Sequence, residues 1–210
     1  MIAAVRVNEA YQRAEEHLSG LDGDWARHIA NVGPCLHASK PAREPFEALV
    51  RAVAYQQLHA KAGDAILGRL LDLYPEASFP TPAQLLATEP ERQRACGFSR
   101  RKIITIRGIA EAAISGVVPT REVAATLLDD ELIQSLSSLR GIGRWTVEMF
   151  LIYTLERPDI LPADDFGMRE GYRRLKGLKA ALTPGQMREV AEKWRPYRTV
   201  ATWYLWRSPP

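Results

Sequence analysis

Two glycines separated by one residue mark the segment that most restricts how this chain can fold. The segment reads LRGIGRWT at residues 139–146 and joins two stretches with the apolar spacing of helices. Gly141 and Gly143 permit backbone angles that side chains exclude, and they let another molecule approach the main chain closely. A helix that starts at about Gly143 would point its first N–H groups out of the turn, where they form a site for an anion. Glycine also ends helices in many folds, so the turn by itself is equally consistent with a purely structural role.

Almost all of the chain has the pattern of short amphipathic helices. Capping boxes begin at Thr81 and Thr183, and Ser99 and Thr120 each precede a helical pattern. No alternating pattern typical of β-hairpins occurs. We therefore expect an all-α protein, with a loop at residues 35–44. The expected helices span residues 8–19, 24–32, 45–58, 61–73, 99–115, 120–127, 129–139, 145–155, 189–194 and 199–206.

Arginine dominates the basic residues of the chain. The 210 residues include 22 Arg and 6 Lys and carry a net charge of +3. Arginine suits planar, bidentate contacts with phosphate. A run of basic residues alone usually marks a solvated helix face, but beside a phosphate-binding turn it favours a surface for DNA or RNA. The basic residues that lie closest together are Arg92, Arg94, Arg100, Arg101, Lys102 and Arg107.

Cysteine content and hydropathy indicate the cellular compartment in which the protein works. Cys35 and Cys96 are too few for a disulfide scaffold and lack metal-ligand spacing. The N-terminus lacks the long apolar core of a signal peptide, and no run reaches membrane-spanning length. These features predict buried, reduced thiols in a cytoplasmic protein without a membrane partner, associated with the nucleoid if the cell is bacterial.

Two adjacent carboxylates, Asp164 and Asp165, follow Pro162 some twenty residues after the glycine turn. An aspartate after a proline commonly caps the next helix, so we expect one of the pair to do so. The other would then face a cleft. An exposed aspartate is ionised at neutral pH, so it would stabilise a developing cation or orient a water rather than donate a proton.

Aromatic residues crowd the C-terminal end. Trp194, Trp203 and Trp206 lie there together with Tyr197 and Tyr204. Core packing is the ordinary role of such residues. Aromatic faces also stack on a base that has left its duplex, and they attract a cationic base.

A polar run at a helix junction is unusual in its apolar surroundings. Gln56, Gln57, Leu58 and His59 follow an apolar helical stretch. The run is consistent with a hydrogen-bonded plug in the core, or with a probe that enters the minor groove and fills the gap left by a flipped base.

Five elements occur in order along the chain: QQL at 56–58, GFSRRK at 97–102, LRGIGRWT at 139–146, PADD at 162–165 and WRPYR at 194–198. Over residues 45–207 they resemble the alkylation-repair branch of the helix-hairpin-helix DNA glycosylases, the 3-methyladenine DNA glycosylase II family. The resemblance implies two helical lobes with the active cleft between them. Residues 45–155 would form the lobe with the hairpin, and residues 1–44 with 156–210 the other. The chain would be a minimal form without the N-terminal β domain of some members.

The resemblance also implies roles for single residues. Asp165 would be the catalytic carboxylate and Asp164 the helix cap. Gln57 or Leu58 would be the wedge in the duplex, and His59 would probe the minor groove. The hairpin would bind DNA phosphate through Gly141, Gly143, Arg144, Trp145 and Thr146. Backbone carbonyls of Leu139, Gly141 and Ile142 would hold a monovalent cation.

Trp145 and Trp206 are the first candidates to flank the flipped base, with Tyr55 and Met149 as further candidates. Trp145 stands where bifunctional relatives place a Schiff-base lysine, and Met149 where some members have a tyrosine. No cysteine follows Cys96, so no iron–sulfur cluster is expected. The resemblance thus predicts a monomeric, monofunctional glycosylase for alkylated purines in damaged double-stranded DNA, with no cofactor beyond a structural cation. The alternatives are a non-catalytic hairpin module that binds DNA, and a glycosylase for deaminated or oxidised bases.

Overall fold

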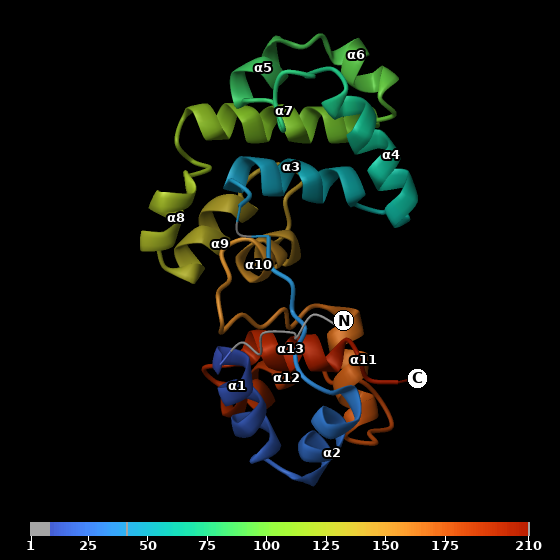
Figure 1. Ribbon diagram of the computed structural model, residues 1–210, viewed down its shortest axis with the longest axis vertical. Coiled ribbons are helices and arrows are strands. Elements are labelled where there is room, and N and C mark those ends of the chain that lie inside the picture. The colour runs from blue at the N-terminus through green and yellow to red at the C-terminus, as the bar shows by residue number, and fades with distance from the viewer. Residues whose placement is uncertain (1–8, 41, 210) are drawn as a thin grey trace, which may run out of the picture. The chain divides into compact units, whose positions relative to one another are not determined.

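The computed structural model describes residues 9–40 and 42–209, and in these ranges it contains helices and loops but no strand (Figure 1). The prediction of an all-α fold is therefore confirmed. The described residues form two compact units, one comprising residues 9–39 with 156–209 and the other residues 40–155 without residue 41. No helix among the described residues is both long enough and apolar enough to cross a membrane.

The family resemblance places residues 40–44 in the lobe formed by the two ends of the chain. The structure instead groups the described residues of this segment with the second unit. The Lys40 N–H donates to Tyr153 O at 2.5 Å. The Arg121 N–H donates to Glu44 Oε2 at 3.1 Å. These bonds to later parts of the second unit group the described residues of this segment with it.

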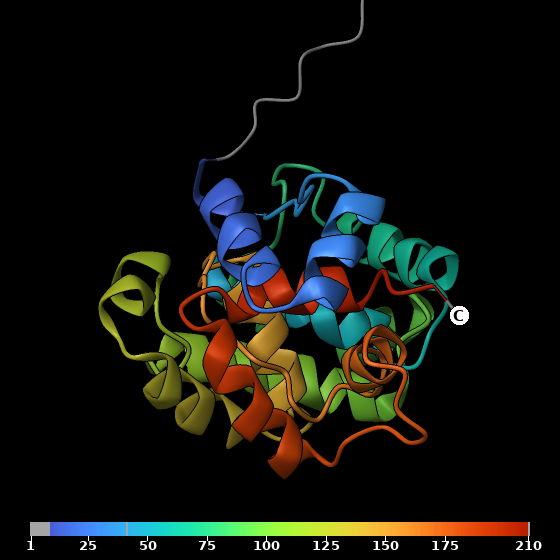
Figure 2. The same cartoon turned by 90° about the horizontal axis from the view of Figure 1, so that it is seen from below.

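In the first unit, α13 is the central helix and contacts α1, α2 and α11 (Figure 2). Large side chains fill the space between these helices, with Trp25 edge-on to Trp194 at 5.4 Å between ring centroids. Both cysteines of the chain are buried and unpaired, as expected, and Cys35 belongs to this core. The elements are α1 (Glu9–Ser19), α2 (Gly23–Val32), α11 (Phe166–Leu175), α12 (Pro184–Ala191), the 3₁₀ turn η1 (Glu192–Trp194) and α13 (Arg198–Leu205).

In the second unit, the long helix α7 lies between α3 and α5 (Figure 1). Ile103, Ile106, Ile109 and Ala110 of α7 are buried at the three- to four-residue spacing of a helix face. Helix α10 packs against α3 and α9. The elements are α3 (Pro45–Tyr55), α4 (Ala60–Leu71), α5 (Pro82–Ala87), α6 (Pro90–Ala95), α7 (Arg100–Ile114), α8 (Arg121–Thr126), α9 (Asp129–Ser137) and α10 (Arg144–Tyr153).

Helix starts follow the expected caps, whereas one helix end does not. The capping boxes at Thr81 and Thr183 and the Ser99 and Thr120 caps are all present. The helix expected at residues 45–58 ends at Tyr55. Gln57 has a φ of +57°, which turns the chain away from the helix. Local propensity did not predict this ending because glutamine rarely adopts that conformation.

Gly171 allows α11 and α13 to approach closely. A Cβ built at this position would lie 2.0 Å from the Leu205 carbonyl oxygen. The clash would be with backbone, so a helix would have to move. Because Asp165 is the N-cap of α11 and Trp206 directly follows α13, this contact also helps to place these two residues near each other.

The substitution Gly171→Ala is expected to lower the free energy of unfolding by about 3 kcal/mol, as overpacking of a closed contact does. Gly68→Ala is the matched control, because Gly68 lies inside α4 and a Cβ there would meet nothing within 4 Å. It should leave stability unchanged or raise it by up to about 1 kcal/mol. Urea unfolding followed by circular dichroism measures both, and equal stability of the two variants would contradict the close-packing argument.

Candidate functional site

The glycine turn forms the predicted hairpin between α9 and α10. Gly141 has a φ of +84°, and a Cβ there would lie 2.4 Å from Thr105 Oγ1 of α7. Gly143 is the N-cap of α10 with a φ of −93°, and a Cβ there would meet nothing within 4 Å. The fold therefore requires glycine at position 141. At position 143 the missing side chain instead leaves open surface in front of the first helical N–H groups.

The first turn of α10 offers fewer groups to an anion than expected. Thr146 is only 5% exposed, and its N–H already donates to Gly143 O at 2.9 Å. The tight first turn therefore uses the Thr146 amide, and a contact of Thr146 with phosphate stays a prediction. Arg144 Nε donates to the buried carboxylate of Glu148 at 2.8 Å, while 47% of the arginine side chain remains exposed.

Trp145 departs from the expectation that residues 145–155 are buried. Its side chain is 47% exposed, whereas Val147, Phe150 and Leu151 of the same helix lie in the core. Met149, one turn further on, is half-buried. A large aromatic group held at the surface of a rigid helix is suited to stacking on a base.

The turn between α3 and α4 carries the predicted wedge residues at its surface. Gln57, Leu58 and His59 are all exposed. Gln56 is different, since its Nε2 donates to Gly141 O at 3.2 Å. This bond ties the turn to the hairpin, a link that spacing along the sequence did not reveal.

Tyr55 immediately precedes this turn and is half-buried. Its hydroxyl donates to Asp64 Oδ1 of α4. That hydrogen bond to a carboxylate raises the pKa of Tyr55, and desolvation adds to the effect. A Cβ at Gly63 would lie 2.3 Å from the tyrosine ring, so glycine there lets the ring pack closely against α4. The contact fixes the ring within the second unit.

Two of the three carbonyls expected to hold a cation already accept a hydrogen bond. Leu139 O accepts from Ile142 N at 3.0 Å, and Gly141 O accepts from Gln56 Nε2. A carbonyl oxygen has two lone pairs, so each retains one. Neutral oxygen donors of this kind suit a hard cation. No group of three or more His, Cys, Asp or Glu with the spacing of a metal site occurs in the described part of the chain.

Asp165, in the first unit, is the N-cap of α11. Its Oδ1 accepts from Met168 N at 2.6 Å and from Trp206 Nε1 at 2.9 Å. The expectation that Asp164 is the cap is therefore wrong. Asp164 is exposed and pairs with Arg188 at 3.2 Å. The helix begins one residue later than a cap at Asp164 requires, so the second carboxylate caps it.

Asp165 lies at the surface among residues that are only partly buried. Asp165 and Trp206 are both half-buried, and Phe166 is 68% exposed. A Cβ at Gly167 would lie 3.3 Å from Asp165 Oδ1 and 3.6 Å from Trp206 Cδ1, so a side chain there would crowd both groups. Phe166 was not expected at the site, although its place directly after the carboxylate pair was a signal.

The remaining tryptophans have the ordinary structural role. Trp25, Trp194 and Trp203 are buried in the first unit. Only Trp145 and Trp206, the two expected to flank a base, keep a substantial part of their surface exposed.

The basic run of the sequence divides into two groups. Arg107 donates to Leu86 O and Thr88 O at 3.0 Å each, and Lys102 Nζ donates to Ala54 O at 2.8 Å. Burial lowers the pKa of Lys102. These two side chains hold the ends of neighbouring helices. The exposed members are Arg92, Arg94, Arg100 and Arg101.

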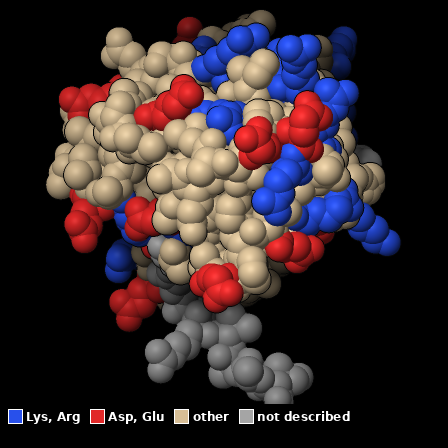
Figure 3. Space-filling model, turned by 90° about the horizontal axis from the view of Figure 1, so that it is seen from above, with Lys and Arg blue, Asp and Glu red and all other residues tan. Residues whose placement is uncertain are grey.

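Figure 3 shows most of the lysine and arginine side chains on one side of the face that carries α5, α6 and α7, with a few acidic side chains among them. Such a one-sided distribution suits an anionic partner better than an evenly charged surface does.

Comparison with known proteins places these features in a family. Residues 50–196 match the family model of the HhH-GPD superfamily base excision DNA repair proteins. DNA-3-methyladenine glycosylase 1 of Schizosaccharomyces pombe is 48% identical over 197 residues, which cover 93% of this chain and 86% of that protein.

Two solved structures are similar over most of this chain. The S. pombe 3-methyladenine DNA glycosylase in complex with abasic DNA has a TM-score of 0.84 at 48% identity, covering 93% of this chain and 95% of that one. The DNA-3-methyladenine glycosidase of Bacillus halodurans has a TM-score of 0.82 at 32% identity, covering 92% and 88%.

Substitution of the two hairpin glycines should separate folding from binding. Gly143→Leu is expected to reduce stability by only about 1 kcal/mol, through a poorer N-cap, yet to weaken binding to damaged and undamaged duplexes alike. Gly141→Ala should instead destabilise the fold by about 2 kcal/mol or more, because of its positive φ and the contact with Thr105. Thermal unfolding and fluorescence polarisation with labelled duplexes test both. If Gly143→Leu weakened binding only to duplexes with one kind of lesion, this would contradict a hairpin site that binds backbone phosphate independently of sequence.

Proposed function

This chain belongs to the HhH-GPD superfamily of base excision DNA repair proteins, and on that premise we propose that it is a monofunctional DNA glycosylase that removes alkylated purines of the 3-methyladenine type from duplex DNA. The similarity to glycosylases named for 3-methyladenine supports the substrate class. The observation that carries the chemistry is the half-buried carboxylate of Asp165, which Met168 N and Trp206 Nε1 hold in place at the start of α11.

Binding would begin at the phosphate backbone. The main chain at Gly141 and Gly143 and the Arg144 side chain would grip one strand, with the α10 dipole adding attraction for the negative charge. Gln57 or Leu58 would fill the gap left by the flipped nucleotide, and His59 would contact the minor groove. Their exposure on a turn tied to the hairpin by Gln56 supports this role.

The bond that breaks is the one between the purine and C1′ of the sugar. Alkylation of a ring nitrogen gives the base a positive charge, so it leaves without a strong general acid. The sugar then develops oxocarbenium character, which the Asp165 carboxylate stabilises. Water adds to C1′, a proton is released to solvent, and the products are the free base and an abasic site.

Aromatic faces would hold the cationic base during this step. Trp206 and Trp145 are the first candidates, with Tyr55 and Met149 as further ones; cation–π attraction favours the charged lesion over an ordinary purine. With Trp145 in place of a Schiff-base lysine, the protein would not cleave the strand.

Other expectations from the sequence complete the proposal. The carbonyls of Leu139, Gly141 and Ile142 would hold a monovalent cation, whose charge would add to the attraction of the hairpin for phosphate. No iron–sulfur cluster is involved. The protein would act as a monomer, in the compartment that holds the DNA, which is the cytoplasm and its nucleoid in a bacterial cell.

Asp165→Asn tests the catalytic role without removing the cap. Asparagine keeps the side-chain oxygen that accepts from Met168 and Trp206, and it is as good an N-cap as aspartate. The variant should fold and bind lesion-containing duplex, but its single-turnover rate of base release should fall on the order of a hundredfold or more. Asp164→Asn removes a carboxylate one residue away that forms only an exposed ion pair, so it should retain activity. Equal rates in the two variants would reject the mechanism.

An excision panel tests the substrate class. Duplexes with 3-methyladenine or 7-methylguanine should release free base, whereas hypoxanthine and 8-oxoguanine, which are neutral, should be released far more slowly. Chromatography of the released bases measures both. Faster release of the neutral bases would favour a glycosylase for deaminated or oxidised DNA. Binding without any release would favour a non-catalytic module.

A further inference from the structure

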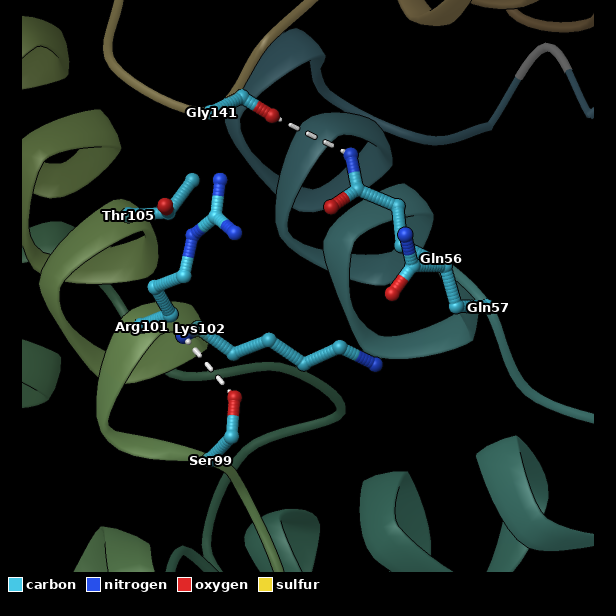
Figure 4. A pocket seen from close by; sticks show the side chains of 7 residues that line it. All are labelled: Gln56, Gln57, Ser99, Arg101, Lys102, Thr105 and Gly141. Atoms are coloured by element: carbon cyan, nitrogen blue, oxygen red, sulfur yellow. Dashed lines mark hydrogen bonds between the residues drawn. The ribbon is translucent and has the colours of Figure 1, made fainter.

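A pocket of about 150 Å³ lies in the second unit, next to the two turns that are proposed to contact DNA. Three segments meet there: the turn after α3, the first turns of α7, and the hairpin (Figure 4). The space is large compared with the roughly 30 Å³ that a water molecule takes in the liquid. It is lined by Gln56, Gln57, Ser99, Arg101, Lys102, Thr105 and Gly141.

The lining is cationic. It contains Arg101 and Lys102 and no carboxylate. The Arg101 guanidinium reaches into the space between Thr105 and Gln56 (Figure 4). Among the described residues no carboxylate pairs with Arg101, whereas many other arginines, such as Arg51, Arg173 and Arg198, have an acidic partner. An unpaired guanidinium in a concave polar site is suited to an oxyanion.

The other polar groups of the pocket already have structural partners. Lys102 Nζ donates to Ala54 O, and Ser99 Oγ accepts from Lys102 N at 3.3 Å, which caps α7. Gln56 Nε2 covers the Gly141 carbonyl, an oxygen that would otherwise face an incoming anion. Arg101 is thus the side chain through which this pocket would bind a ligand, and the capped helix terminus is secondary.

We propose that this pocket binds a phosphate group of the DNA backbone through the Arg101 guanidinium, as a second anchor beside the hairpin amides. The Lys102 ammonium adds positive potential. Through the bond between Gln56 and Gly141 the pocket and the hairpin form one continuous surface, so both would contact the same duplex. The inference rests on the proposed function, since the duplex supplies the phosphate.

Arg100 offers a control matched in charge and position. It is exposed on the same helical turn as Arg101, but it does not line the pocket. Arg101→Gln and Arg100→Gln each remove one charge and keep a side chain of similar length. Neither should change the unfolding temperature, because the structure gives neither arginine an ion pair to lose.

The experiment measures binding of each protein to a duplex with an abasic-site analogue over a series of salt concentrations. A lost phosphate contact lowers the slope of log K against log salt by about 0.9. Arg101→Gln should show this change, with affinity about tenfold weaker near 0.1 M salt, and Arg100→Gln a clearly smaller one. Equal effects of the two substitutions, or none for Arg101→Gln, would overturn the proposal.

A competition arm identifies the source of the phosphate. Inorganic phosphate is compared with chloride at matched ionic strength. Stronger competition by phosphate that disappears in Arg101→Gln supports a site for any phosphate. If phosphate and chloride compete equally, while Arg101→Gln still lowers the slope of log K against log salt, the pocket binds phosphate only as part of a duplex. If the wild-type protein does not bind DNA, the proposed function itself is rejected. If the wild-type protein binds DNA but Arg101→Gln and Arg100→Gln have equal effects on binding, only the proposed role of the pocket is rejected.

Discussion

The contact of Gly141 with Thr105 holds the hairpin of the second unit in place. With a φ of +84° and a side chain of α7 filling the position of its missing Cβ, Gly141 brings the hairpin directly against the long helix. The same glycine offers its carbonyl to Gln56 and so positions the turn that carries the exposed Gln57, Leu58 and His59. The proposed phosphate grip, gap-filling residues and anion pocket all depend on this arrangement.

In the first unit, one carboxylate oxygen serves structure and proposed chemistry together. Asp165 Oδ1 caps α11 and accepts from the Trp206 indole, so two donors from different parts of the chain fix the direction of the carboxylate. Such preorganisation is what electrostatic stabilisation of a transition state requires, because the charge need not reorient during the reaction. The close passage of α11 over α13 at Gly171 is the packing condition that brings the two residues within reach.

The basic residues show why charge along a sequence does not by itself define a binding surface. Six of them lie within sixteen positions, yet Arg107 and Lys102 donate to backbone carbonyls at helix ends. Arg101 reaches a pocket, and its neighbour Arg100 does not line it. Residues that follow one another on a helix point about 100° apart, so equal charges on one turn have different environments.

Local sequence determined the helical class, most helix starts and the hairpin, because capping residues, apolar spacing and glycine act within a few residues of themselves. It also marked the Asp164–Asp165 pair and the C-terminal tryptophans, from which the family resemblance selected Asp165 and Trp206. Only tertiary structure decided which aspartate caps α11, that the helix after Pro45 ends at Tyr55, that the Thr146 amide is already used, and that Trp145 stays at the surface. Each of these depends on a partner far away in the chain or on the register of a single turn, and spacing along the sequence contains neither.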